Sequence, residues 1–508
     1  MSVALRSPDG GAPLEQRRIW TIFGGLMLGT FLGSLDQTVV TTALPTIVRE
    51  IGMPTQLSWV VTGYLLASTV STGLWGKLSD LYGRKAIYLT CTGIFLLGSA
   101  LCGLSQSMIE LILFRTLQGI GGGGLMVLAQ TIVGDIVSPR ERGKYQGIFV
   151  SVFGLSSVVG PFVGGFLVDS LSWRWIFYVN LPVGLLSLVV SALVLPIAVA
   201  RRQAHVDWAG ASLLTLATTA LVLLTTLGGT PLPLNSLQAI ALGLTAALGA
   251  VAFVAVERLA REPILAPRLF TNSVFVVASV LSLVVGAMML GSVSFLPSFL
   301  QNVKGASPTQ SGVDMLPLML GLLLTSTVSG QIVSRTGHYK PLPIVSLAVT
   351  TVGLFMMSTM DTRTSIEVIS AYLFVFGAGL GLGMQVLTVA VQNVVSVRDL
   401  GAATSGVNFF RSIGSLIGVA MFGAIYAGAL TAELGSSSST PQAYADAIHS
   451  VFVSVLPLSS AAFILSWFLK EVPLRATRSE TDAAPTPSAP STMSSDKTLT
   501  PALAATGD

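Results

Sequence analysis

Charged residues are scarce in this 508-residue sequence. Asp, Glu, Lys and Arg together make up 10% of it, whereas a soluble domain usually carries about 25%. A water-soluble fold of this length would need more polar surface than that amount of charge supplies. Because 52% of the residues are hydrophobic, the composition indicates a protein that crosses a membrane several times. It excludes a secreted disulfide scaffold, a nucleic-acid binder and a disordered chain.

Cysteine and histidine are scarce too, with two and three residues respectively. Cys91 and Cys102 lie in one apolar segment, and a rigid helix would hold them too far apart for a disulfide. This set offers no zinc or haem site, so no cofactor is predicted. The polar start of the chain leads into a full-length apolar run without a small-residue cleavage site. That arrangement predicts a retained first transmembrane helix rather than a cleaved signal peptide.

Long apolar segments recur along the chain. About 20 mostly apolar residues cross the hydrocarbon core of a bilayer. By this rule the sequence predicts an all-α polytopic membrane protein with fourteen spans. The predicted spans are 19–44, 58–77, 86–105, 108–133, 144–168, 175–197, 208–228, 238–256, 274–301, 309–333, 342–360, 366–394, 402–430 and 449–469.

Positive charge is distributed unevenly between the two sides of the predicted spans. If the N-terminus lies inside, most of the 27 Lys and Arg residues fall on that side. The exceptions are Arg49, Arg174, Lys304 and Arg363 on the other side, and Arg115 and Arg411 within spans. Because short loops rich in Lys and Arg stay in the cytoplasm, we expect a multi-pass protein of the plasma (inner) membrane with both termini cytoplasmic.

The sequence contains two related halves, because glycines of the second loop and the fourth and fifth spans recur in the same order later. The matched pairs are Gly76/Gly330, Gly83/Gly337, Gly119/Gly377, Gly121/Gly379, Gly143/Gly401 and Gly160/Gly418. Chance explains any single pair but not the repeated order. Parallel six-helix repeats are typical of transporters. The predicted units are a cytoplasmic tail at 1–18, a six-helix bundle at 19–200, two additional helices at 201–268, a second six-helix bundle at 269–475 and a disordered cytoplasmic tail at 476–508.

The loop after the second span contains Gly76, Asp80, Gly83, Arg84 and Lys85. Gly83 permits a tight turn, and Asp80 can pair with Arg84 or cap a helix N-terminus. We interpret the five residues as a cytoplasmic latch. Ordinary positive-inside charge is the alternative, and it explains Lys85 but not the spacing of the others.

The same loop is not a phosphate-binding loop, because Ser71 stands where a Walker A sequence needs its first glycine. No other ATP site is visible in the sequence. We therefore expect an ion gradient to supply the energy for transport.

Three further segments carry glycine, proline or charge inside spans. They are Leu35-Asp36-Gln37-Thr38-Val39-Val40 in the first span, Arg115-Thr116-Leu117-Gln118-Gly119-Ile120-Gly121 in the fourth, and Gly154, Gly160, Pro161, Gly164 and Gly165 in the fifth. Together with the loop above and the stretch 173–182, they resemble the fourteen-span drug:proton antiporter branch of the major facilitator superfamily. The likeness is specific in the first six spans. It is weaker in the second half, where Ser334 and His338 replace the acidic and basic loop residues.

That resemblance implies the major facilitator fold, with two six-helix bundles plus two extra helices. It implies a secondary active exporter of the multidrug efflux type and not an enzyme. In this family the fifth-span motif is taken to form a hinge that favours antiport over leak, and Asp135 would be the acidic partner of Arg84.

The fifth-span motif also has a physical interpretation of its own. Pro161 lacks an N–H, so the carbonyl of Ser157 is left free and the helix kinks. The flanking glycines allow close contact between helices. A generic packing seam remains the alternative interpretation.

Ionisable side chains inside spans cost roughly 2.5–3.5 kcal/mol on insertion scales, and therefore mark functional candidates. We expect Asp36 and Arg115 to take part in proton coupling, with Asp36 as the proton carrier. A permanent structural pair is the alternative. Gln118, Asp314 and Arg411 are secondary candidates: Asp314 could complement a helix dipole or form a second cation site, and Arg411 could reach the inner surface from its span.

The sequence as a whole predicts a protein that exports amphipathic cationic or neutral compounds in exchange for protons. The expected partners are a small-molecule substrate, protons and membrane lipids, with no nucleic acid, and the protein is expected to be a monomer. Two alternatives stay open. The same antiporter chemistry could serve one endogenous metabolite, antibiotic or lipid, or the chain could be a membrane receptor or scaffold that has lost transport.

Overall fold

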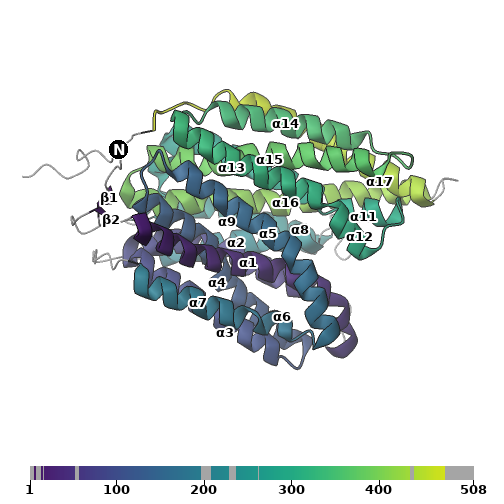
Figure 1. Cartoon of the computed structure of the whole chain (residues 1–508), viewed down its shortest axis with the longest axis horizontal. Coiled ribbons are helices and arrows are strands. Elements are labelled where there is room, and N and C mark those ends of the chain that lie inside the picture. Colours follow the sequence, from purple (N-terminus) through teal and green to yellow (C-terminus); the bar gives the residue numbers. More distant parts are fainter. Residues whose placement is uncertain are drawn as a thin grey trace, which may run out of the picture.

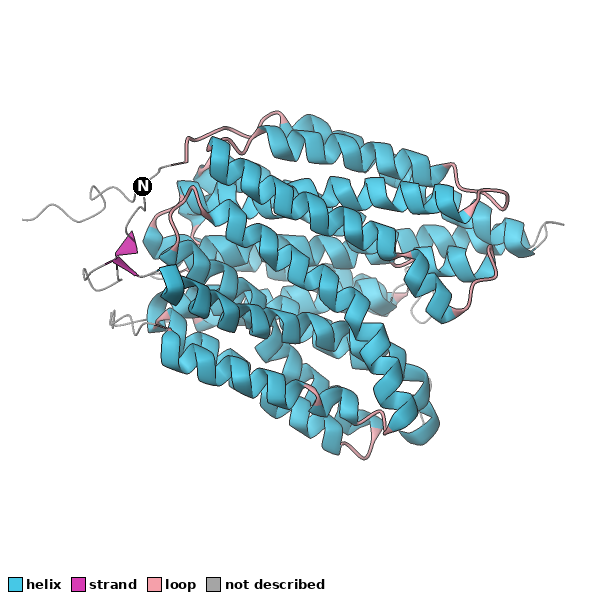
Figure 2. Ribbon diagram, viewed as in Figure 1, coloured by secondary structure: helices cyan, strands magenta, loops and turns pink. Residues whose placement is uncertain are grey.

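The computed structural model is built of long helices that lie roughly side by side (Figure 1). It describes residues 5–6, 13–14, 16–51, 57–195, 207–227, 236–260, 263–434 and 440–474. The tail expected at 476–508 and most of the tail expected at 1–18 lie outside the described residues. Next to the helices there is one short antiparallel strand pair near the N-terminus, β1 (Leu5–Arg6) and β2 (Pro13–Leu14) (Figure 2).

The apolar segments of the sequence form helices because a bilayer offers no water to the backbone, so its polar groups must be satisfied within each span. The α-helices are α1 (Gln16–Ile51), α2 (Leu57–Tyr82), α3 (Arg84–Leu104), α4 (Met108–Ile136), α5 (Arg142–Ser170), α6 (Trp175–Tyr178), α7 (Asn180–Val194), α8 (Trp208–Leu227), α9 (Leu237–Leu259), α10 (Ser273–Val293), α11 (Leu296–Asn302), α12 (Pro308–Asp314), α13 (Leu316–Thr336), α14 (Pro341–Ser358), α15 (Ile366–Val394), α16 (Leu400–Leu434) and α17 (Thr440–Ser466). The two 3₁₀ helices span Pro267–Thr271 and Val397–Asp399.

Three of the predicted spans are broken into two helices each. The pairs are α6 with α7, α10 with α11, and α12 with α13. In α11 and α13 a proline occupies one of the first two helical positions. Proline is tolerated there because its missing N–H has no partner in the first turn anyway. Hydropathy alone did not predict these breaks.

Twelve helical stretches of the described residues are long and apolar enough to cross a membrane. They do not include α2 and α5, which at 26 and 29 residues are also long enough to cross. With these two helices added, each of the fourteen predicted spans has its counterpart in the structure.

The two halves repeat the same helix packing. In the first half α1 packs on α5, α2 on α4, and α3 on α4; in the second half α10 packs on α16, α13 on α15, and α14 on α15. Two seams join the halves, α2 against α16 and α5 against α13, and the repeat relates one seam to the other. We call the end of the structure at which α1 begins and α2 ends the inner end, and the opposite end the outer end.

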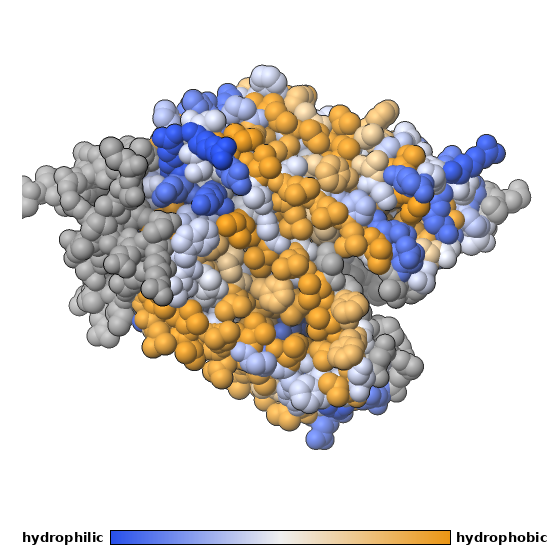
Figure 3. Space-filling view, viewed as in Figure 1, coloured by the Kyte–Doolittle hydropathy of each residue, from blue (hydrophilic) through white to orange (hydrophobic). Residues whose placement is uncertain are grey.

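Apolar side chains cover the middle of both halves, and polar side chains gather toward the two ends (Figure 3). Many large apolar residues are exposed, among them Phe162 (80%), Leu193 (79%) and Val251 (69%). Such a belt cannot face water, but it matches the hydrocarbon core of a bilayer. The chain is therefore a multi-pass membrane protein. The same view shows the surface hollowed between the two halves at the outer end (Figure 3).

Candidate functional site

A buried ion pair lies inside the first half. Asp36 of α1 and Arg115 of α4 are 1% and 2% exposed, and Arg115 Nη1 lies 2.6 Å from Asp36 Oδ2. Both residues were expected in proton coupling, and the structure brings them into direct contact. They are 79 residues apart in the sequence, so only the packing of α1 against α4 makes this pair.

Two amides complete the surroundings of the carboxylate. Asp36 Oδ1 accepts hydrogen bonds from Gln118 Nε2 and from Asn180 Nδ2, each at 2.9 Å. Gln118 Oε1 in turn accepts from Arg115 Nη1 at 2.7 Å, and Asn180 Nδ2 also donates to Ser99 Oγ at 3.0 Å. Helices α1, α4 and α7 therefore meet at one carboxylate, and α3 is joined to it through Asn180.

Aromatic rings lie against the guanidinium group. The Arg115 guanidinium carbon lies 4.2 Å from the ring centre of Tyr64 and 5.9 Å from that of Phe177. A cation over a ring face is attracted by the ring quadrupole, so these contacts help Arg115 to remain charged away from water. Its Nε has no hydrogen-bond partner among the described residues.

Asn180 and Tyr64 were not among the predicted site residues. Asn180 lies in the stretch 173–182 that carried part of the family resemblance, and an amide at the start of an otherwise apolar helix was the available signal. Tyr64 gave none, because an aromatic residue in a span is usually a packing residue.

Protonation of Asp36 would change the energy of this arrangement. A proton on Asp36 neutralises the carboxylate and leaves Arg115 as an uncompensated buried charge, which is strongly unfavourable. Proton uptake therefore requires Arg115 to move or to gain another partner. In the described conformation neither side chain is open to water or lipid.

The hinge motif of α5 touches the helix that carries Asp36. Thr38 Oγ1 donates to the carbonyl of Ser156 across the α1–α5 contact at 3.0 Å. A Cβ atom placed on Gly160 would overlap the Thr38 hydroxyl. Gly160 therefore has to be glycine for α1 and α5 to approach this closely, and Thr38 lies only two residues beyond Asp36.

The other motif residues of α5 have different surroundings. A Cβ on Gly154 would lie 2.7 Å from Leu323 of α13, so Gly154 packs at the seam between the halves. Gly164 is buried, whereas a Cβ on Gly165 would meet nothing within 4 Å. The helix continues through Pro161. Close packing thus involves Gly154 and Gly160 but not Gly165.

At the inner end, Asp80 binds the first turn of a helix of the other half. Its Oδ1 accepts the N–H of Gly401 at 3.1 Å, and its Oδ2 accepts the N–H of Ala402 at 2.8 Å. A carboxylate at a helix N-terminus satisfies free N–H groups and complements the helix dipole. The interaction spans the α2–α16 seam and holds the two halves together.

Arg84 bridges two carboxylates at the same place. Its Nη1 lies 2.5 Å from Asp80 Oδ1, and its Nε lies 2.7 Å from Asp135 Oδ2. Gly83 has a φ of 94°, which favours glycine, and Lys85 Nζ donates to the carbonyl of Leu195 at 3.0 Å. Burial raises the pKa of Asp80 to about 6, and the charge of Arg84 opposes that rise.

The repeated glycines make the two seams. A Cβ on Gly76 would overlap Ser405 and lie 2.5 Å from the carbonyl oxygen of Gly401, and a Cβ on Gly330 would overlap the carbonyl of Gly143. Gly76 matches Gly330 and Gly143 matches Gly401 in the repeat, so the two crossings are equivalent. Glycine is needed at both because backbone meets backbone.

Charge at the two seams is not equivalent. Ser334 takes the position of Asp80 in the second half and has no carboxylate to offer. There Arg140 donates instead to the carbonyls of Ser334 and Arg335, at 3.0 and 2.6 Å. The α2–α16 seam is thus held by a buried acid, and the α5–α13 seam by an exposed arginine.

Comparison with known proteins agrees with this geometry. The family model described as Major Facilitator Superfamily matches residues 26–419. The chain belongs to the major facilitator superfamily. It is therefore a transporter and not an enzyme, as its sequence predicted.

Three curated relatives and two solved structures illustrate the likeness. An uncharacterized MFS-type transporter of Mycobacterium tuberculosis is 42% identical over 490 residues, covering 92% of this chain and 71% of the relative. Two Bacillus subtilis proteins are the multidrug transporter protein MdtP (39% identical; 81% and 76% covered) and multidrug resistance protein 3 (37%; 82% and 81%). The match to the crystal structure of the human organic anion transporter MFSD10 covers 89% of this chain and 100% of MFSD10, with 15% sequence identity and a TM-score of 0.63. The proton:xylose symporter XylE gives the same identity and score, with 90% and 97% covered.

The two remaining candidates of this transporter lie apart from Asp36. Asp314 ends the short helix α12 toward the outer end and accepts from Gln310 Nε2 at 2.7 Å. Arg411 of α16 is 6% exposed. Instead of reaching the inner surface, as the sequence allowed, its guanidinium turns toward α15 and donates to the carbonyl of Met384 at 2.9 Å.

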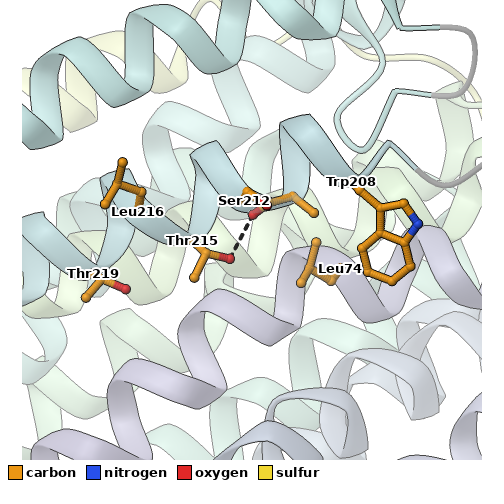
Figure 4. Close-up of a pocket in the computed structure, with 7 residues that line it drawn as sticks. Leu74, Trp208, Ser212, Thr215, Leu216 and Thr219 are labelled. Carbon is orange, nitrogen blue, oxygen red and sulfur yellow. Dashed lines mark hydrogen bonds between the residues drawn. The ribbon is translucent and has the colours of Figure 1, made fainter.

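Helix α8 lines a cavity together with α2, and α9 carries a buried acid near its inner end. A cavity of about 470 Å³ lies between α2 and α8, lined among others by Leu74, Trp208, Thr215 and Leu216 (Figure 4). At the inner end of α9, Glu257 is 3% exposed and accepts the N–H groups of Ile264 and Leu265. This acid lies just beyond the uncharged stretch 208–256 and fixes the connection to α10.

Proposed function

We propose that this transporter exports amphipathic cationic or neutral compounds in exchange for protons. The inner end faces the cytoplasm in this proposal, as the distribution of Lys and Arg predicts. The described conformation is then closed toward the cytoplasm by the Asp80 interaction and the two glycine crossings.

The observation that carries the proposal is the Asp36–Arg115 pair. A carboxylate away from water, with a strong partner that it must release before it can take up a proton, suits a proton carrier. A proton entering from outside would free Asp36 from Arg115. Release toward the cytoplasm would restore the pair, and a cationic substrate could compete for the same carboxylate.

The contact between Thr38 and the Gly160 region supports coupling to conformation. A change at Asp36 shifts α1, and α1 touches α5 where Gly160 leaves no room. Because α5 also packs on α13 of the other half through Gly154, movement at the pair reaches the α5–α13 seam.

Two relatives named as multidrug proteins support a broad substrate range. A part in antibiotic resistance and a place in the plasma membrane belong to the same proposal. The test is substrate-induced proton release. Purified protein is reconstituted into liposomes that contain a pH-sensitive dye, and a panel of lipophilic cations and neutral amphipaths is added. We expect several compounds to move protons. Transport of labelled compounds without proton movement would contradict the proposal, and activity on one compound alone would indicate a dedicated exporter.

A further inference from the structure

A buried arginine without a carboxylate lies in the second half. Arg411 is 6% exposed, and no described carboxylate lies within ion-pair distance of it. By contrast, Arg115 at a similar burial has Asp36. An unpaired buried cation is costly, so the difference between the two arginines needs a reason.

The neutral groups around Arg411 do not satisfy it. Besides the carbonyl of Met384, its acceptors are Thr388 Oγ1 and Asn408 Oδ1, both at a long 3.4 Å. Its Nε has no hydrogen-bond partner in the described part of the chain. The site therefore holds a full positive charge and one free N–H.

A chain of side-chain amides leads from Arg411 to a second free donor. Asn408 Nδ2 donates to Gln130 Oε1 at 2.9 Å, and Gln130 Nε2 donates to Gln385 Oε1 at 3.5 Å. This direction of donation leaves Gln385 Nε2 without an acceptor among the described residues, although Gln385 is only 3% exposed. Gln385 is the neighbour of Met384, which binds Arg411, so the chain returns to its starting point.

The group of Gln130, Gln385, Asn408 and Arg411 lies between the two halves. Gln130 belongs to α4 of the first half, and the other three to α15 and α16 of the second. Donors outnumber acceptors, and the net charge is positive. A ligand that fits must bring acceptor oxygens and negative charge.

We infer that Arg411, Gln385 and Gln130 bind the carboxylate of an amphipathic substrate, so that the transporter accepts carboxylate-bearing and zwitterionic compounds as well as cations. This inference rests on the proposed export function and names a further class of substrate for it. Asp36 serves the proton, and Arg411 serves the acidic group of the compound. A carboxylate accepts from a guanidinium and from amide N–H groups, which is what the site leaves unused. Separation of the halves exposes the group and closure buries it, as alternating access requires.

The test uses two dyes that differ in one group. Rhodamine 110 has a free carboxylic acid, and rhodamine 123 is its methyl ester. Binding to the full-length protein in lipid nanodiscs is measured by fluorescence anisotropy for the wild type, Arg411→Gln and Arg411→Lys. Arg268→Gln is the matched control, because Arg268 is a basic residue of the turn before α10 whose partner, Asp399, lies near the inner end.

We expect Arg411→Gln to weaken binding of rhodamine 110 about tenfold or more, because the carboxylate loses a hydrogen bond from a charged donor. Binding of rhodamine 123 should weaken less than about twofold. Arg411→Lys should retain part of the affinity for rhodamine 110, and Arg268→Gln should leave the binding of both dyes unchanged. Equal weakening of both dyes, or wild-type protein that does not bind rhodamine 110, would overturn the inference.

Two further measurements keep the result interpretable. If Arg411→Gln does not fold, Gln385→Met is used instead, because it removes one free donor. It should weaken binding of rhodamine 110 but not of rhodamine 123. Equal effects on the two dyes would also overturn the inference. Proton release is recorded separately. Selective binding of the acid without proton movement contradicts the proposed function alone, and proton-coupled transport without acid selectivity contradicts this inference alone.

Discussion

Replacing Asp80 with asparagine should open the inner end of the protein. The carboxylate accepts two backbone N–H groups of α16 and pairs with Arg84. A hydrogen bond to a charged group contributes roughly 1.5–3 kcal/mol and one to a neutral group roughly 0.5–1.5. Asparagine keeps one acceptor and turns its NH₂ group toward a donor. The closed conformation should therefore lose about 2–4 kcal/mol, and its ratio to the open conformation should fall about 30-fold to several hundred-fold.

Accessibility of a single cysteine measures this shift. Ser326 of α13 is fully buried and faces the carbonyl of Gly147 across the α5–α13 seam. Ser326→Cys is a small change, and it is placed in a chain without Cys91 and Cys102. Because the reporter lies at the other seam, it responds to separation of the halves and not to local damage near Asp80. Labelling from the cytoplasmic side should speed up at least about tenfold in Asp80→Asn.

Asp399→Asn is the matched control. Asp399 also precedes α16, but it pairs at 2.5 Å with Arg268 of the turn before α10 and not with a residue of the first half, so its loss should leave labelling almost unchanged. Equal labelling in Asp80→Asn and the parent chain would refute the role of Asp80 in closure. Equal acceleration in both variants would show that any change at the start of α16 opens the seam.

Three further changes test other contacts. Gly160→Leu should reduce efflux to background with normal membrane insertion, because the side chain has no room beside Thr38. Gly165→Leu should retain efflux because its Cβ meets open space. Full efflux by Gly160→Leu would contradict the close packing. Thr38→Val should lower efflux driven by a pH gradient, since it loses the hydrogen bond to the Ser156 carbonyl, and Thr38→Ser should restore it; equal loss in both would make the hydroxyl irrelevant. Glu257→Gln should destabilise the protein by about 1–3 kcal/mol because one backbone N–H loses its acceptor. We expect a lower melting temperature with efflux retained. An unchanged melting temperature would contradict a stabilising role of the Glu257 hydrogen bonds.

Spans and seams could be read from the sequence to different degrees. Apolar run length gives the spans directly, and the glycine spacing gives the repeat. The crossing of Gly76 with Gly401 could not be predicted, because the repeat matches Gly76 with Gly330 in sequence, whereas in the structure Gly76 contacts Gly401. Contacts between the two halves can be identified only from the packing of the helices in the structure.

The sequence also did not predict how each helix is rotated about its axis. In a span that is apolar on every face, hydropathy does not say which way a polar side chain points. Arg411 could therefore be placed toward the inner surface, whereas it faces α15. Asp36 was identified because any acid in a span stands out. Asn180 was missed because amides are common near span ends, and Tyr64 because an aromatic residue in a span is usually a packing residue.

The central claim is that Asp36 carries the proton, and Asp36→Asn tests it most directly. The variant and the wild type are reconstituted into proteoliposomes, and accumulation of a substrate against its gradient is measured with and without an imposed pH gradient. Glu50→Gln, an exposed acid on the same helix that pairs with Arg174, is the control. We expect Asp36→Asn to bind substrate but to show no accumulation driven by the pH gradient, while the control accumulates it normally. Undiminished gradient-driven accumulation by Asp36→Asn would contradict the account and place the proton site elsewhere.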